Sequence, residues 1–173
     1  MGTTGAPAGM AADADADAAA ALNALGERHE RGEGIAVDAR MAADYFRAAA
    51  ARGSAVARFN LAGLYFLGEG ATQDDAEALR LYASAAEGGH VESAFLVGRM
   101  YHNGRGAAVN VDEALCWYER AAAKGHEDAA ASVRRLVGPL DHSRLGPYIL
   151  PIIASFAAVI ALAGYGLLWL LAL

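Results

Sequence analysis

Apolar side chains recur at helical spacing on either side of short glycine-containing turns. Ala57, Leu61 and Tyr65 lie four residues apart, so they share one face of a helix predicted over 56–67. The sequence Gly-Glu-Gly at 68–70 then provides two positions that tolerate positive φ, where the chain can reverse tightly. This stretch therefore predicts a helix followed by a turn.

A second helix is predicted after the turn. Asp74 or Asp75 stands where a helix N-cap acceptor is needed, and the two glycines at 88–89 end the helix. Between these signals the small and apolar residues again lie at helical spacing, at Ala78, Leu81, Tyr82, Ala85 and Ala86. Residues 54–89 therefore predict a helical hairpin.

The hairpin pattern occurs three times with a period of 36 residues, at 18–53, 54–89 and 90–125. A partial fourth copy at 126–136 supplies only a first helix. The three copies align without a gap, in a register fixed by Leu25/Leu61/Val97, His29/Tyr65/Tyr101, Gly32/Gly68/Gly104, Gly34/Gly70/Gly106, Ala42/Ala78/Ala114, Phe46/Tyr82/Tyr118, Ala49/Ala85/Ala121 and Gly53/Gly89/Gly125. Agreement in this many columns is not chance.

Neither helix of a hairpin has an apolar stripe wide enough for a core of its own, so burial must come from neighbouring repeats. Small residues such as Ala62, Ala78 and Ala85 suit close approach of helices rather than the filling of volume. The expected fold is an all-α, right-handed solenoid of αα-hairpins. First helices should line its concave side, second helices its convex side, and the helix at 126–136 should cap the stack.

The string LVGRMYHNGRGAAVNVDEALCWYERAAAKG at 96–125 resembles the Sel1-like repeat family, relatives of the tetratricopeptide repeats. Both turn glycines, the Trp117-Tyr118 pair and the Ala-Ala-x-x-Gly ending match the family pattern. Departures from it are His29 for tyrosine, Ala71 and Ala107 for the turn valine, and Asn110 for aspartate. The resemblance covers residues 18 to about 136. It implies a protein–protein interaction adaptor with no catalytic residue to carry over.

Charge and cysteine content narrow the possible partners. The formal net charge is −6, and every charged side chain precedes Pro147, so the repeats would repel a phosphate backbone. Nucleic acid is therefore not expected as a partner. Cys116 is the single cysteine, which excludes an intrachain disulfide and a thiolate metal cluster and fits a reducing compartment. The Ala- and Gly-rich composition suggests a bacterial source.

Residues 1–17 contain almost nothing large to bury, so composition predicts a disordered tail rich in alanine and aspartate. Asp13, Asp15 and Asp17 alternate with alanine but lack the coordinating loop of a calcium site, so we interpret them as solvated charges. A secretory signal would need basic residues and a long apolar run near Met1, and neither is present.

The segment 148–173 contains no charged side chain. Counted from Pro151 it has 23 residues, which as a helix span about 34 Å and exceed the ~30 Å hydrocarbon core of a bilayer. We therefore expect one transmembrane helix over 148–173, joined to the repeats by a linker at 137–147. Tyr148 and Trp169 would lie at the two membrane interfaces.

The orientation of that helix follows from the charges beside it. Arg134, Arg135 and Arg144 precede the segment and no charged residue follows it, so the positive-inside rule places the repeats in the cytoplasm. We expect a tail-anchored, single-pass protein of the bacterial inner membrane, with the lipid bilayer as one partner. Within the span, small residues suited to helix–helix contact recur at Ala154, Ala157, Ala161 and Gly164. The alternative is that this seam is incidental, because alanine is abundant throughout the chain.

No arrangement of side chains in the sequence indicates catalysis or metal binding. His90 and His126 share a repeat position where another copy has serine, which favours a helix-start role, because no carboxylate or thiol recurs with them. His29 replaces a packing tyrosine and has no nucleophile at matched spacing. Cys116 adjoins Trp117 among acidic neighbours, so we expect it to pack rather than react. We expect no catalytic residue, metal, cofactor or small-molecule substrate.

Positions of the first helices that packing does not use form the candidate partner-binding surface. They are Glu27, Glu30, Arg31, Asn60, Gly63, Phe66, Leu67, Arg99, His102 and Asn103. Copy two has Phe66-Leu67 where the other copies have charged or polar pairs, and an apolar spot flanked by charge is typical of a binding hot spot. The alternative is that Phe66 packs sideways against the next repeat.

Two functions remain open from the sequence. In the first, the protein is a scaffold whose cytoplasmic repeats recruit or assemble a protein partner at the membrane. In the second, it is an accessory subunit or assembly factor of a membrane protein complex, contacted mainly through the transmembrane helix. A third class, the secreted relatives linked to cell-wall and β-lactam chemistry, carries paired cysteines in each repeat. This chain has no such pairs, and no nucleophile–base arrangement.

Overall fold

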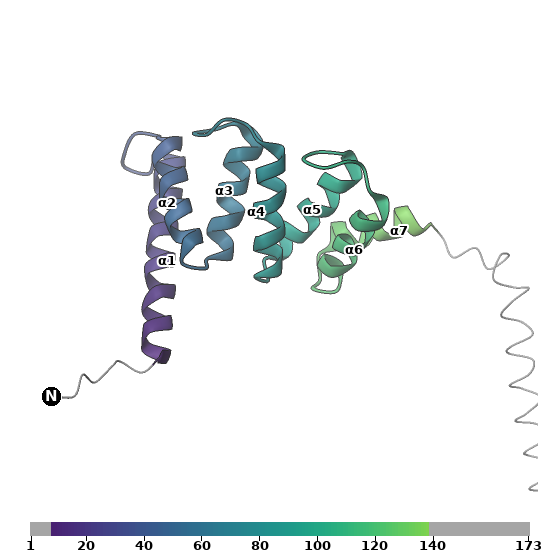
Figure 1. The fold of residues 1–173 in the computed structure, drawn as a ribbon, viewed down its shortest axis with the longest axis horizontal. Coiled ribbons are helices and arrows are strands. Elements are labelled where there is room, and N and C mark those ends of the chain that lie inside the picture. Colours follow the sequence, from purple (N-terminus) through teal and green to yellow (C-terminus); the bar gives the residue numbers. More distant parts are fainter. Residues whose placement is uncertain (1–7, 139–173) are drawn as a thin grey trace, which may run out of the picture. The chain divides into compact units, whose positions relative to one another are not determined.

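The computed structural model describes residues 8–138, and all regular secondary structure in that range is helical. Six helices form three consecutive hairpins, each packed against the next, and a seventh helix follows (Figure 1). The helices are α1 (Ala8–Arg31), α2 (Ala39–Ala51), α3 (Ala55–Leu67), α4 (Asp75–Glu87), α5 (Val91–Asn103), α6 (Val111–Ala122) and α7 (Glu127–Val137). The predicted three-hairpin, all-α solenoid with one further helix is therefore confirmed.

The second helix of every hairpin begins at the same repeat position. Asp38, Asp74 and Asn110 have extended backbone conformations, and their side chains accept hydrogen bonds from amides of the first helical turn. Asp74 Oδ1 accepts two such bonds, each of 3.0 Å. Of the two acids expected to cap α4, Asp74 is therefore the cap and Asp75 is the first helical residue.

The first helices of copies two to four also share a cap position. Ser54 Oγ accepts the amide of Ala57 at 3.1 Å, and the Nδ1 atoms of His90 and His126 accept the amides three residues on, at 3.3 and 3.2 Å. An Nδ1 that accepts carries no proton, so these caps require the neutral imidazole ring. The helix-start interpretation of both histidines is confirmed.

Within a hairpin, an aromatic ring on the second helix packs against a small residue on the first. A Cβ added at Gly26 would lie 2.5 Å from the Phe46 ring, and one at Gly98 would lie 2.7 Å from the Tyr118 ring. The equivalent position in copy two is Ala62, which is fully buried. Because no larger side chain fits, these positions set how closely the two helices approach.

The second glycine of the turn joins one repeat to the repeat before it. Gly70 lies against the backbone of Ala39, the first residue of α2, and Gly106 lies against Asp75, the first residue of α4. A Cβ at either glycine would overlap the neighbouring carbonyl, and both glycines have positive φ, 68° and 76°. Within residues 8–138, a Cβ at Gly34 would meet only the Arg28 side chain, at 3.5 Å. Gly70 and Gly106 are thus needed for the close contact with the preceding repeat as well as for their backbone conformation.

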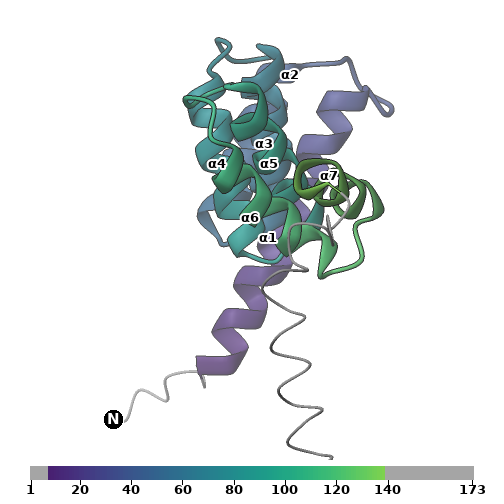
Figure 2. The ribbon, with the colours of Figure 1, turned by 90° about the vertical axis from the view of Figure 1, so that its right-hand side faces the viewer.

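The helix α1 is longer than the other first helices, with 24 residues against 13 in α3 and α5 and 11 in α7. Residues 8–17 belong to it, so the predicted disordered tail does not extend over them. Figures 1 and 2 both show this end of α1 projecting past α2, and Asp13, Asp15 and Asp17 are exposed there. Alanine has the highest helix propensity, which favours helix without burial. The lack of large side chains to bury therefore does not by itself exclude a helix here.

The predicted transmembrane helix at 148–173, including the seam residues Ala154 to Gly164, lies outside the described residues. So do residues 1–7 and residues 139–147 of the predicted linker. Within residues 8–138 no helix combines the length and the apolar character needed to span a bilayer. The span therefore stays a prediction from the sequence.

Candidate functional site

The candidate residues of copy one are engaged mainly with one another. Arg31 Nη2 lies 2.7 Å from Glu27 Oε2, and Asn23 Nδ2 donates to Glu27 Oε1 at 2.8 Å. Asn60 on α3 in turn donates to Asn23 Oδ1 on α1 at 3.1 Å. Glu27, Arg31 and Asn60 therefore belong to a polar joint between two helices, while Glu30 beside them is exposed.

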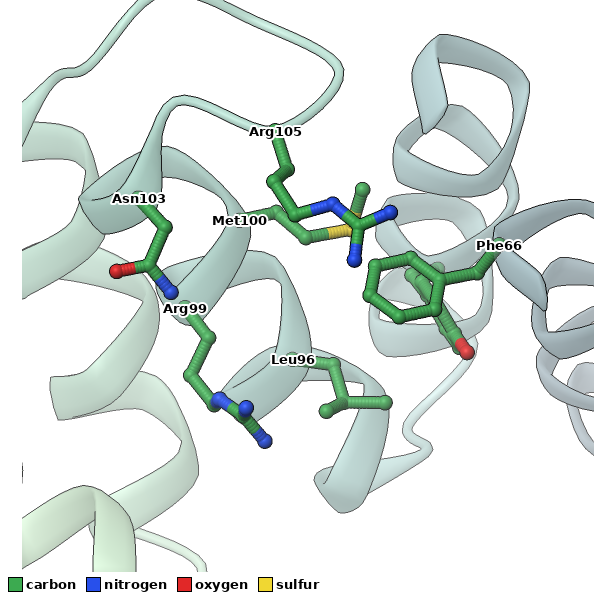
Figure 3. Close-up of a pocket in the computed structure, with 7 residues that line it drawn as sticks. Phe66, Leu96, Arg99, Met100, Asn103 and Arg105 are labelled. Atoms are coloured by element: carbon green, nitrogen blue, oxygen red, sulfur yellow. The ribbon is translucent and has the colours of Figure 1, made fainter. Parts of the chain in front are cut away.

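A first hollow opens between α3 and α5 and has a volume of about 190 Å³. Phe66 on α3 stands on one side, residues of α5 stand on the other, and Arg105 from the turn after α5 reaches across (Figure 3). The lining side chains are Phe66, Tyr82, Leu96, Arg99, Met100, Asn103 and Arg105. This volume is below the roughly 300–1,000 Å³ of typical small-molecule pockets and suits a side chain from a partner.

Phe66 occupies two environments at once. One side of it packs against the apolar core, and the guanidinium of Arg105 stacks over its ring with 3.7 Å between the guanidinium carbon and the ring centroid. Two hydrogen bonds to Asp75, of 2.7 and 2.9 Å, hold Arg105 there. Phe66 therefore contacts the next repeat sideways and still lines the first hollow. The two predicted interpretations of this residue are not exclusive.

A second hollow adjoins the first and lies between α5 and α7, with a volume of about 490 Å³. It is lined by Phe95, Arg99, His102, Asn103, Tyr118, Asp128, Ser132, Arg135 and Leu136. Arg99 and Asn103 line both hollows, so the two lie side by side along α5, and together they form the depression described below. Among the predicted surface residues, Phe66, Arg99, His102 and Asn103 are brought together there.

The depression carries positive charge on an acidic protein. Within residues 8–138 Arg99 has no ion-pair partner, and its guanidinium lies 5.8 Å from the Phe95 ring centroid. Arg135 donates to Ser132 Oγ at 2.9 Å. Burial raises the pKa of Tyr82 to about 12 and also raises the pKa of Tyr118, so both phenols stay neutral at physiological pH.

Besides the four residues around the joint of copy one, two more of the predicted surface residues line neither hollow. Leu67 is exposed at the last position of α3. Gly63 is half-buried, and a Cβ there would meet Tyr82 Oη at 3.7 Å. Sequence reasoning missed Arg105 and Arg135, because their approach to the depression depends on where a turn and the last helix lie relative to α3 and α5.

The remaining candidate side chains form no reactive group in the structure. His29 stacks on Tyr45 with 5.4 Å between ring centroids, and its Nδ1 is buried without a hydrogen-bond partner among the described residues. Cys116 is exposed, so the prediction that it packs is wrong: it lies on the outer face of α6, and the buried face holds Trp117. Residues 8–138 contain no group of three or more side chains able to hold a metal ion.

The structure is that of an α-helical repeat protein of the class that mediates protein–protein interactions. Its hairpins stack in series, with glycine turns and polar caps, and leave a surface open along the first helices. The chain belongs to the Sel1 repeat family, which matches residues 19–54, 55–90 and 91–126. Sel1 repeats form non-catalytic scaffolds that typically mediate protein–protein interactions. No curated protein matches the chain in sequence.

Solved structures resemble this one in fold. A Sel1 repeat protein from Oxalobacter formigenes is 36% identical with a TM-score of 0.66, over 70% of this chain and 49% of that one. A protective antigen of uropathogenic Escherichia coli strains, with an SLR fold, is 32% identical with a TM-score of 0.63, over 64% and 24%. Cysteine-rich protein B of Helicobacter pylori, 19% identical with a TM-score of 0.51 over 68% and 95%, shares the fold. The chain thus spans less than half the length of the first two.

Proposed function

We propose that this protein is a membrane-anchored adaptor whose repeats recruit or assemble a protein partner at the cytoplasmic side of a bacterial inner membrane. The observation that carries the docking role is the depression along α5, formed by the first and second hollows. The apolar rings and exposed polar groups in its lining match the composition of protein interfaces. The uncharged segment 148–173 supports the anchoring role.

Site-specific photocrosslinking in native membranes tests the docking role. A photoreactive phenylalanine analogue replaces Asn103, which lines both hollows, in the full-length chain. The matched control places the analogue at Glu87, an exposed residue at the last position of α4. We expect a discrete crosslinked protein from position 103 and not from position 87. Equal crosslinks from both positions, or none from position 103, would contradict the docking role.

Anchoring is tested by fractionating the full-length chain beside a version that ends at Arg144. We expect the full-length chain in the membrane fraction after a high-salt wash and the shortened version in the soluble fraction. If both versions behave alike, the segment 148–173 does not anchor the protein. Protease that digests the repeats in inverted vesicles but not in spheroplasts is the result expected for a cytoplasmic solenoid.

A second function is favoured by the small-residue seam in the same segment, at Ala154, Ala157, Ala161 and Gly164. In that case the protein is an accessory subunit or assembly factor of a membrane complex, and the main contact is made within the bilayer. Replacing 148–173 by an unrelated apolar span distinguishes the two functions. The partner stays bound if the repeats carry recognition, and it is lost if the membrane helix carries recognition.

A further inference from the structure

The depression along α5 combines two kinds of surface at one place. The first hollow is largely apolar, because Phe66, Leu96 and Met100 stand around it. Arg99 lines this hollow and the second hollow, and Figure 3 shows it on the α5 side beside Leu96. An apolar recess therefore lies directly beside a guanidinium.

The charges around the depression do not cancel. Arg105 is neutralised by Asp75 through two hydrogen bonds. Arg99 and Arg135 have no carboxylate partner within residues 8–138. The one acidic side chain in either lining is Asp128, in the second hollow.

This local excess of positive charge contrasts with the net charge of −6 of the whole chain. The rest of the protein therefore repels acidic molecules, and the depression is a place where one is attracted. A planar guanidinium presents paired donors that match a carboxylate in a bidentate arrangement. Arg99 is exposed and free to adopt it.

We infer that the depression takes a peptide segment in which an apolar side chain is adjacent to an acidic residue. The apolar side chain enters the first hollow between Phe66 and Met100, and the carboxylate pairs with Arg99. Arg135 lies further along the depression and attracts a second acidic group. The inference rests on the proposed docking function and specifies the chemistry of the partner.

The probe is a library of random nine-residue peptides displayed on phage. It is selected on the full-length chain, held in nanodiscs of phosphatidylcholine so that the lipid surface is uncharged. We expect the enriched peptides to carry Asp or Glu beside Leu, Phe or Met. Enrichment of apolar peptides without an acidic residue, enrichment of basic peptides, or no enrichment would overturn the inference. Crosslinking from position 103 tests the docking role by itself, so the two can fail separately.

Substitutions then locate the acidic contact with a synthetic enriched peptide and fluorescence anisotropy. Arg99→Glu should weaken binding about tenfold or more, because attraction becomes repulsion, and 0.5 M salt should weaken binding to the unaltered protein. Arg134→Glu is the matched control, since this exposed arginine on α7 lines neither hollow, and it should change affinity less than about threefold.

A charge swap gives the sharpest test. Replacing the acidic residue of the peptide with lysine should abolish binding to the unaltered protein and restore binding to the Arg99→Glu variant. Equal affinity of both peptides for the unaltered protein would overturn the assigned pairing. Circular dichroism at 222 nm checks that the Arg99→Glu variant keeps its helices, as expected for an exposed side chain.

Discussion

The contact between the second turn glycine and the preceding repeat, here called the glycine joint, gives a prediction with an internal control. Gly34, Gly70 and Gly106 occupy the same repeat position, and all three have positive φ, of 74°, 68° and 76°. Gly70 lies against the carbonyl of Ala39, whereas a Cβ at Gly34 would meet only an arginine side chain within the described residues. Gly34→Ala should therefore lose only the free energy needed to hold alanine at positive φ. Gly70→Ala should lose that free energy and, in addition, the free energy needed to relieve the steric overlap with the Ala39 carbonyl.

The two costs can be estimated separately. A left-handed conformation costs a non-glycine residue about 1–2 kcal/mol, so Gly34→Ala should lower the free energy of unfolding by about that amount. Overpacking adds roughly 1–3 kcal/mol, and here the obstacle is main chain that moves only with its whole helix. Gly70→Ala should therefore cost about 2–5 kcal/mol, and Gly106→Ala, which meets Asp75 in the same way, should cost a similar amount.

The assay is urea denaturation of the full-length chain in mild detergent, followed by circular dichroism at 222 nm. We expect the unfolding midpoint to fall in the order unaltered protein, Gly34→Ala, then Gly70→Ala and Gly106→Ala together. Faster hydrogen exchange in α2 and α3 should accompany Gly70→Ala, because that joint connects them. If Gly34→Ala and Gly70→Ala lose stability equally, within about 0.5 kcal/mol, the contact contributes nothing and glycine is needed only for its backbone conformation.

Three further outcomes are expected. Gly63→Ala should stabilise α3 by up to about 1 kcal/mol, because a Cβ meets Tyr82 Oη at an ordinary 3.7 Å; a loss of thermal stability would contradict this. Asp75→Ala should cost about 1 kcal/mol in urea denaturation, since it frees Arg105; no change would show that the pair is energetically neutral. Burial lowers the pKa of His90, and the negative charge of Glu92 partly opposes this shift. The unfolded chain therefore binds the proton more tightly than the folded chain does. The free energy of unfolding should decrease as the pH falls below about 6.5, the ordinary pKa of histidine. The melting temperature of His90→Ser should change less between pH 7.5 and pH 5.5 than that of the unaltered protein. An equal change would refute the assignment of this pH dependence to His90.

The helical hairpins were predictable from sequence because each signal that forms them is local. Apolar spacing identifies the helices, and a cap such as Asp74 needs only its own side chain and the next turn of backbone. Each of these signals also occurs in all three copies of the repeat. The start of α1 was not predicted correctly, since alanine favours helix by propensity and the sequence argument considered only burial.

The candidate site was only partly predictable, because it is made by contacts between repeats. Position within one helix placed Phe66, Arg99 and Asn103 on the exposed side, and the structure brings them to one depression. The same reasoning placed Asn60 there, but its amide is used in the joint with α1. The stacking of Arg105 on Phe66 depends on how one turn meets the start of the preceding second helix, which no pattern within a single repeat encodes.

At Gly70 and Gly106 the contact between repeats is made by main-chain atoms, and this affects how the protein can evolve. The carbonyl it uses belongs to alanine in one case and aspartate in the other, so this main-chain contact does not require a particular side chain there, although Asp75 adds its ion pair with Arg105. Units whose surfaces have diverged can still be connected in series. A whole repeat can then be duplicated or deleted while its neighbours stay as they are, and recognition can evolve by changing copy number as well as by substitution.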